Sequence, residues 1–332
     1  MKILYAVQAT GNGHIARAIE LLPMLETFGK VDIFLSGSNS QLNGMLPVIY
    51  RSKGISLFYG KSGGLDYQRI LKSFAPFQIW RDIQNIPVEQ YDWVLNDFEP
   101  VCALACRLKK VPSLGIGHQA SFHSKNVPRP KKREVLGETI LKKYAPASKY
   151  IGFHFNSYDS WILQPIIKHE LIDATPTNQD HITVYLPQFG IEELTKAFYW
   201  IRDRKVEIFT TYVNEVTQVN QLKFIPPSHA GFTESMLHAS TVITAGGFET
   251  PAEALYLGKR LMVIPIKGQY EQACNAAALK DMGVPVLHSL EDIQNQLFYL
   301  MQQEPSRRLD YAYSMDILKK QIEWHWQNWS FS

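Results

Sequence analysis

A histidine follows the first apolar run of the chain at a position where it could work as a base. The run KILYAV (2–7) leads into QATGNGHIARA (8–18), in which His14 comes just before a helical pattern that starts near Ile15. The dipole of a helix disfavours positive charge in its first turn, so an imidazole there stays neutral and can accept a proton. His14 is therefore a candidate general base, with a capping or loop histidine as the alternative.

A glycine turn in the second half has the features of a phosphate site. In TVITAGGFETPAEAL (241–255) a strand ends, two glycines turn the chain, and a helix begins near Phe248 to Thr250. The free backbone N–H groups of a helix start bind phosphate, and Gly246 and Gly247 allow close approach. A purely structural strand-to-helix turn is the alternative.

Carboxylate and amide side chains near that turn fit a ribose and a further hydroxylated group attached to the diphosphate. Glu253 lies one turn into the helix, where its carboxylate can accept hydrogen bonds from both hydroxyls of a ribose. The buried run RLMVIPI ends at the same edge of the sheet, and KGQYEQ after it supplies three side chains that could hold sugar hydroxyls: Gln269, Glu271 and Gln272. The stretch therefore predicts a site for a nucleoside diphosphate that carries a further hydroxylated group.

Short apolar runs alternate with helical patterns along the whole chain, which favours parallel sheets covered by helices. We expect an α/β protein with two doubly wound, Rossmann-like domains facing a cleft, and ligands beyond the carboxyl ends of the strands. The predicted first domain comprises residues 1–163 with a returning C-terminal helix at 310–332. The predicted nucleotide-sugar domain spans 178–309, and 164–177 is the linker.

The composition limits the partners. The chain has 332 residues, of which 45% are hydrophobic and 20% charged, and its net charge of +3 is too mild to indicate nucleic-acid binding. No stretch is long and apolar enough to predict a membrane span. Cys102, Cys106 and Cys274 lack the spacing of a metal or redox site, so we expect reduced core residues in a cytoplasmic protein.

These motifs resemble the GT-B glycosyltransferases that use nucleotide sugars, particularly the MurG-type N-acetylglucosaminyltransferases and the UDP-glycosyltransferases. The resemblance rests on Gly246-Gly247, Glu253, Gly258-Lys259-Arg260, Pro265, Glu271-Gln272 and Asn275. It implies that these elements bind diphosphate, ribose and sugar in that order, with Phe248 at the helix start. It also implies that Phe232 leads into a helix beside the base, although Phe232 could equally be a core residue.

The resemblance also assigns roles in the first domain. In the UDP-glycosyltransferases a histidine in this loop takes the proton of the acceptor hydroxyl and an aspartate from a later strand end holds its ring, which implies His14 and Asp97 here. The alternative for Asp97 is an N-cap for the helix that starts near Pro100. GHQASF (117–122) resembles the MurG-type H-E-Q-N segment, which makes His118 a second candidate base or an acceptor contact.

The sequence departs from these families at several points. Ala245 stands where many UDP-glycosyltransferases have a histidine that contacts the diphosphate. We therefore expect the backbone amides and Thr250 to supply more of the contacts with the diphosphate here. HITVYLPQFG lacks the glycine-rich loop of the MurG-type enzymes. The first loop also fits the dinucleotide fingerprint G-x-G-x-x-A, which would make Gly13 a ligand-binding position, but Ser36 rather than an acidic residue closes the second strand.

The parts together predict a transfer reaction without a cofactor or metal. An acceptor hydroxyl deprotonated by His14 attacks the anomeric carbon of a nucleoside diphosphate sugar, and the helix start holds the departing diphosphate. No D-x-D cluster is present. The resemblance implies inversion at the anomeric carbon, a UDP-linked donor, and hexosyl or N-acetylhexosaminyl transfer.

The acceptor is not specified by the sequence. The basic loop SKNVPRPKKRE (124–134) is either solvated or attracts an anionic or lipid-linked acceptor. Trp324, Trp326 and Trp329 either pack the returning helix or contact the inner face of a membrane peripherally. Two other functions stay open on the same fold: a nucleotide-sugar 2-epimerase, and a protein that binds a nucleotide sugar without turnover.

Overall fold

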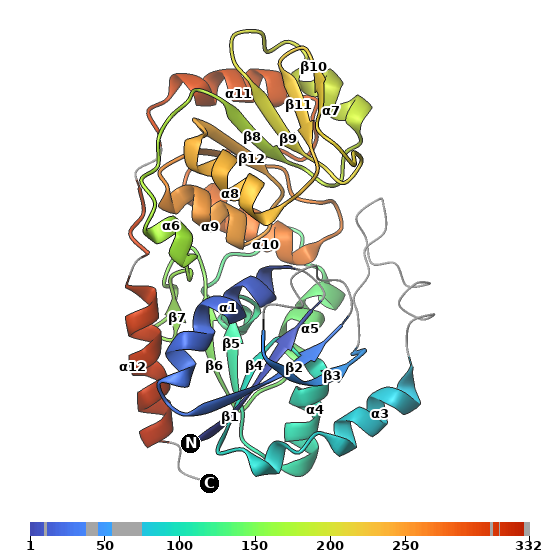
Figure 1. The fold of residues 1–332 in the computed structure, drawn as a ribbon, viewed down its shortest axis with the longest axis vertical. Coiled ribbons are helices and arrows are strands. Elements are labelled where there is room, and N and C mark those ends of the chain that lie inside the picture. Colours follow the sequence, from blue (N-terminus) through green and yellow to red (C-terminus); the bar gives the residue numbers. More distant parts are fainter. Residues whose placement is uncertain (10–11, 38–45, 55–74, 306–307, 312, 329–332) are drawn as a thin grey trace.

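Two α/β units form the molecule, one above the other along its long axis (Figure 1). The computed structural model describes residues 1–9, 12–37, 46–54, 75–305, 308–311 and 313–328. Each unit is built on its own sheet, and the strands of both sheets are mainly parallel. The prediction of two doubly wound α/β units is confirmed.

The sheet of the first unit has the strand order β3-β2-β1-β4-β5-β6-β7. Its strands are β1 (Lys2–Gln8), β2 (Lys30–Ser36), β3 (Val48–Ser52), β4 (Trp93–Asp97), β5 (Leu114–Gly117), β6 (Lys149–Phe153) and β7 (Ile162–Leu163). All neighbours pair in parallel, and Val7 of β1 pairs with Asp97 of β4. The loop that follows β1 therefore leaves the sheet beside the end of β4.

Helices cover both faces of this sheet, which explains its apolar strands. They are α1 (Asn12–Glu26), α3 (Pro76–Asn85), α4 (Pro100–Lys109) and α5 (Val135–Lys143). Along β1, Ile3 and Val7 belong to the buried cluster that contains α1 residues, whereas Leu4 and Ala6 belong to the cluster with α3 and α4. Because successive side chains of a strand point to opposite faces of the sheet, the residues of β1 contribute to the apolar cores on both faces.

The sheet of the second unit has the order β10-β11-β9-β8-β12-β13. Its strands are β8 (Ile182–Tyr185), β9 (Val206–Phe209), β10 (Thr217–Val219), β11 (Leu222–Ile225), β12 (Thr241–Thr244) and β13 (Arg260–Val263), with helices α7 (Ile191–Phe198), α8 (His229–His238), α9 (Glu249–Tyr256), α10 (Tyr270–Asp281) and α11 (Ile293–Gln302). Only the β10–β11 pair is antiparallel. The sequence analysis did not predict this hairpin, and beyond β13 an isolated parallel bridge joins Val263 and Val286.

The two units share one apolar core. The buried cluster that contains Ile15 of α1 continues into Ala252 and Leu255 of α9. Phe248, at the start of α9, lies 5.1 Å from Phe155 of the first unit between ring centroids. The two units are therefore packed against each other around the start of α9.

The last helix, α12 (Ser314–Gln327), lies along the first unit (Figure 1). It contacts α1 and β7, and the ring of Trp326 lies 4.9 Å from that of Trp93. Trp324 is 56% exposed, whereas Trp329 lies outside the described residues.

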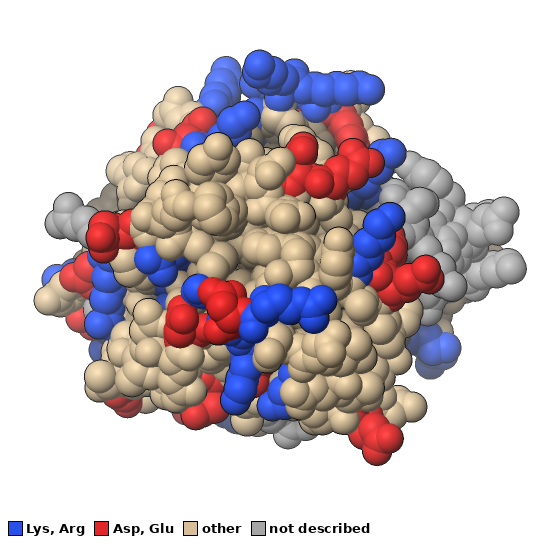
Figure 2. All heavy atoms as spheres, turned by 90° about the horizontal axis from the view of Figure 1, so that it is seen from above, with Lys and Arg blue, Asp and Glu red and all other residues tan. Residues whose placement is uncertain are grey.

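The end of the molecule seen in Figure 2 carries basic and acidic side chains in neighbouring groups rather than a face of one sign. This mixed pattern agrees with the mild net charge of +3. In the part of the chain that the structure describes, no helix combines the length and the apolar character needed to cross a membrane.

Candidate active site

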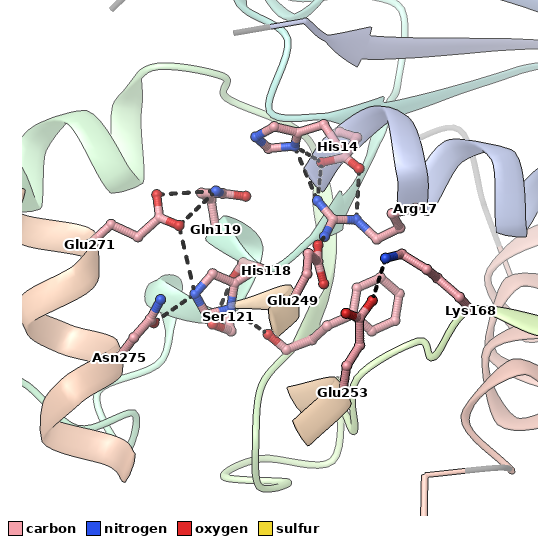
Figure 3. A network of polar contacts seen from close by, with 12 residues as sticks. His14, Arg17, His118, Gln119, Ser121, Lys168, Glu249, Glu253, Glu271 and Asn275 are labelled. Carbon is pink, nitrogen blue, oxygen red and sulfur yellow. Dashed lines mark hydrogen bonds and ion pairs between the residues drawn. The ribbon is translucent and has the colours of Figure 1, made fainter. Parts of the chain in front are cut away.

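Polar residues from both units meet where the carboxyl ends of the first sheet face the start of α9 (Figure 3). Gly13 lies at this contact, because a Cβ atom on it would stand 3.3 Å from Cγ of Glu249. The absence of a side chain lets α1 and α9 approach. Gly13 thus has a packing role here, whatever it contributes to ligand binding.

His14 and Asp97 form a hydrogen-bonded pair in this region. Nδ1 of His14 lies 2.8 Å from Oδ1 of Asp97, and the side chains are 13% and 0% exposed. A carboxylate only accepts, so in the neutral imidazole Nδ1–H is the donor and Nε2 keeps its lone pair. The sequence predictions for the two residues therefore meet in a pair with the geometry of an oriented base.

Arg17, three residues after His14 on α1, holds the same aspartate by two hydrogen bonds. Its Nε donates to Oδ2 at 2.8 Å and its Nη2 donates to Oδ1 at 2.9 Å. Burial alone would raise the pKa of Asp97, but the charge of Arg17 and the contact with His14 lower it to about 2. Asp97 is therefore ionised at neutral pH and fixed in orientation.

The N-cap alternative for Asp97 is wrong, because Glu99 has that position. The Glu99 carboxylate accepts from the backbone N–H groups of Val101 and Cys102 at the start of α4. It is fully buried, and burial raises its pKa to about 7. The Asp97 carboxylate therefore does not cap α4 and forms its hydrogen bonds with His14 and Arg17.

Glu249 links this group to the second unit. Nη1 of Arg17 donates to its Oε1, so one guanidinium joins carboxylates of both units. Burial raises the pKa of Glu249 to about 7 against the opposing charge of Arg17, and the Glu253 charge adds to the rise. The sequence analysis missed Arg17 and Glu249; the spacing of His14 and Arg17 on one helix face was a usable signal.

The glycine turn before α9 is held by side chains of α10. Gln272 Oε1 accepts from the backbone N–H of Gly246 at 3.1 Å and from that of Ile266 at 2.9 Å. Asn275 Nδ2 donates to the Gly246 carbonyl at 3.1 Å. Gln272, predicted to hold the donor sugar, therefore shapes the turn in this arrangement. Gly247 is more open, since a Cβ atom there would meet nothing within 4 Å.

The start of α9 agrees with the expectation, because Phe248 is the N-cap residue and Thr250 lies in the first turn. Glu253, the predicted ribose ligand, is buried and forms an ion pair with Lys168 at 2.9 Å. Lys168 belongs to the segment predicted as the linker. Its ammonium pairs with the carboxylate that was predicted to hold the ribose diol, and no sequence pattern indicated this pairing.

His118 is poorly placed to act as a base. It is 1% exposed, its Nδ1 lies 2.9 Å from the Phe153 carbonyl oxygen, and its Nε2 lies 2.8 Å from Oδ1 of Asn275. Its ring stacks on Phe248 with centroids 3.9 Å apart. Burial lowers its pKa. The ring joins the two units, and neither nitrogen is free for an acceptor in this arrangement.

The other predicted donor ligands lie around the same cleft. Both carboxylate oxygens of Glu271 accept from Nε2 of Gln119 at 3.1 Å, and Gln269 Oε1 accepts from Nε2 of Gln272 at 2.7 Å. Phe232 packs edge-on against Phe209 with ring centroids 5.1 Å apart, which favours its core role. Among the described residues, no group of His, Cys, Asp and Glu side chains is arranged to hold a metal ion.

The comparisons with known proteins identify the family of the chain. The family model described as "Glycosyl transferase family 1" matches residues 1–301. The chain belongs to this family. It is a glycosyltransferase, as the sequence resemblance predicted, and a search of curated protein sequences gives no match.

Solved structures of glycosyltransferases share the fold along nearly the whole chain. Arabidopsis thaliana UGT89C1 complexed with UDP-L-rhamnose is 12% identical, with a TM-score of 0.62 and coverage of 97% of this chain and 94% of that one. Phytolacca americana UGT2 complexed with UDP-2-fluoro-glucose and pterostilbene is 13% identical, with a TM-score of 0.60 and coverage of 96% and 93%. Acinetobacter baumannii MurG is 13% identical, with a TM-score of 0.55 and coverage of 97% and 99%.

Proposed function

We propose that this glycosyltransferase moves a hexosyl or N-acetylhexosaminyl group from a UDP-sugar to an acceptor hydroxyl, with His14 as the general base. The observation that carries the proposal is the position of the His14–Asp97 pair directly against the start of α9, through Arg17 and Glu249. A base and a diphosphate site must face one anomeric carbon from opposite sides, and this contact brings them together.

His14 takes the proton of the acceptor hydroxyl on Nε2 while the oxygen attacks the anomeric carbon. The ionised Asp97 stabilises the imidazolium that forms, and Arg17 keeps the carboxylate oriented. The sugar–phosphate bond breaks as the new bond forms, and the backbone N–H groups at residues 247–250 receive the negative charge of the diphosphate. One displacement inverts the anomeric carbon, and this scheme needs neither a metal nor a cofactor.

The donor binds along α9 and the start of α10. Glu253 accepts hydrogen bonds from the ribose hydroxyls after these displace the Lys168 ammonium. Thr250 adds a contact to those that the backbone N–H groups make with the diphosphate. Glu271 and Gln269 face the sugar. Gln272 acts indirectly, since it holds Gly246. Uridine is supported by the bound nucleotides of the two plant structures.

The acceptor is anionic or lipid-linked in this proposal. In the loop at 124–134, Arg129 bonds inward to Glu138 and to the Phe122 carbonyl, whereas Lys131, Lys132 and Arg133 are exposed. Val135, which starts α5, is 84% exposed next to these cations. Exposed cations beside an apolar side chain suit a phosphate-bearing lipid, so we place the enzyme peripherally at the cytoplasmic face of a membrane.

The test is the release of UDP from a panel of UDP-, dTDP- and GDP-sugars, with the products identified by mass spectrometry and NMR. A transferase releases the nucleoside diphosphate only when a suitable acceptor preparation, such as a membrane lipid extract, is added. An altered sugar configuration at C2 without glycosylated product would identify the epimerase. Tight binding of an intact donor under all conditions would identify a binding protein.

A further inference from the structure

Arg17 has a position that the proposed mechanism does not fully use. Its side chain is 4% exposed, and two of its nitrogens are fixed by Asp97. The third, Nη1, points across the interface to the first turn of α9 (Figure 3). A buried guanidinium held at this angle needs little reorganisation to bind another anion.

The anion that Nη1 now holds is the carboxylate of Glu249, the first residue of α9. An acidic residue stabilises a helix start. The same helix start is where the proposed function puts the donor diphosphate, so a carboxylate and a diphosphate compete for one region of positive potential. Glu249 therefore occupies the place of an anion in the present arrangement.

We propose that Arg17 binds the diphosphate of the donor and that the Glu249 carboxylate is bound to the Arg17 guanidinium when no donor is present. This inference rests on the proposed function of the same site. Donor binding exchanges the Glu249 carboxylate for a phosphate oxygen on Nη1. Arg17 then faces the group whose negative charge grows as the sugar–phosphate bond breaks, while Nε and Nη2 keep Asp97 oriented. Its other contacts with Asp97 make it both a ligand and a positioning residue.

The exchange depends on the protonation of Glu249. The charged or titratable groups that face its carboxylate come from several elements: Arg17 and His14 of α1, Asp97 of β4, Tyr5 of β1, Lys168 of the linker and Glu253 of α9. Burial raises the pKa of Glu249 to about 7. Above pH 7 its carboxylate is ionised, holds Arg17 and repels a diphosphate. Below pH 7 it is neutral and yields the guanidinium more easily.

The experiment is calorimetric titration of UDP and UMP into wild type, Glu249→Gln, Arg17→Gln and Arg17→Lys at pH 6 and pH 8. Glu26→Gln, at an exposed residue in the last turn of α1, is the matched control. Because the phosphate groups of UDP also titrate near pH 6, each variant is compared with wild type at the same pH. UMP lacks the phosphate nearest the sugar, so it separates a contact with that phosphate from a general loss of binding.

We expect Glu249→Gln to bind UDP at least about fivefold more tightly than wild type at pH 8, and to differ little at pH 6. Both Arg17 variants lose about tenfold or more in UDP affinity and much less in UMP affinity. Equal UDP affinity of wild type and Glu249→Gln at both pH values overturns the inference. If the Arg17 variants do not fold, this comparison of wild type with Glu249→Gln alone tests the inference. If wild type binds no UDP, the proposal of a UDP-linked donor is wrong as well. If wild type binds UDP and every variant binds it with the same affinity, only the proposed role of Arg17 is wrong.

Discussion

The two sides of the cleft differ in how complete they are. On the first-unit side, His14, Asp97 and Arg17 already have the contacts that a base and its orienting groups need. On the second-unit side, the predicted donor ligands are occupied by groups of the protein itself. Glu253 holds Lys168, and Gln272 holds Gly246. In the proposed mechanism the catalytic side is preorganised, whereas donor binding exchanges internal contacts for ligand contacts, which costs affinity but favours ligands that replace every contact.

Removal of the base gives the largest expected effect and tests the catalytic side alone. We expect His14→Ala to lose about 10² to 10⁴ in kcat, because general base catalysis contributes an effect of this size. UDP affinity should stay within about twofold, since His14 contacts no predicted donor ligand except through Arg17. UDP release and calorimetry provide the two readouts, and Gln296→Ala, at an exposed residue of α11, is the control. Equal losses in kcat and UDP affinity would contradict the division between the two sides.

Removal of the ribose ligand tests the donor side. Glu253→Gln should weaken UDP binding by about 1 to 3 kcal/mol, because a charged acceptor for two hydroxyls is replaced by a neutral amide. Calorimetric titration of UDP measures the change, with Glu192→Gln on exposed α7 as the control. An affinity for UDP equal to that of wild type would show that the ribose binds elsewhere.

Acid titration tests how firmly the catalytic side is assembled. The pKa of Asp97 is lowered from the usual 3.8 to about 2, so its ionisation favours the folded state above pH 3.8 and this contribution is lost as the pH falls toward 2. The difference corresponds to roughly 2 kcal/mol in the free energy of unfolding. Urea unfolding at pH 5, 3 and 2 should show a smaller loss for Asp97→Asn than for wild type. Parallel losses in the two proteins would mean that Asp97 is not specifically stabilised in its ionised form.

The smallest expected effect concerns the ion pair that covers Glu253. Lys168→Met removes the ammonium with which a ribose competes, so UDP affinity should rise by about 0.5 kcal/mol while the free energy of unfolding falls because Glu253 is left unpaired. Calorimetry and urea unfolding measure the two changes. A weaker affinity for UDP would indicate that Lys168 itself contacts the nucleotide.

Much of this arrangement could be predicted from local patterns. The glycine turn, the start of α9 and the strand that ends at Asp97 follow from apolar runs and turn residues. His14 could be chosen because its position after the first strand is itself a local feature. The predicted limits of the two domains rest on the same kind of signal and stay predictions.

The contacts between the units could not be predicted in the same way. Arg17, Glu249 and Lys168 bind partners that are 80 or more residues away in the sequence, and no spacing in the sequence records such pairs. His118 was predicted as a second base or an acceptor contact because GHQASF resembles the MurG-type segment, and Gln272 was predicted to hold the donor sugar because it follows a buried strand at the same edge of the sheet. The structure gives each of them internal partners: Nε2 of His118 meets Asn275 of the second unit, and Gln272 holds Gly246 within its own unit.

The central claim is that the donor binds along α9 opposite the His14–Asp97 pair. A crystal structure with UDP tests it most directly. We predict the diphosphate at the N–H groups of residues 247–250 with Arg17 Nη1 as a further ligand, the ribose hydroxyls on Glu253 with Lys168 displaced, and His14 Nε2 facing the vacant acceptor side. UDP bound elsewhere, with the Lys168–Glu253 ion pair intact, would contradict the account.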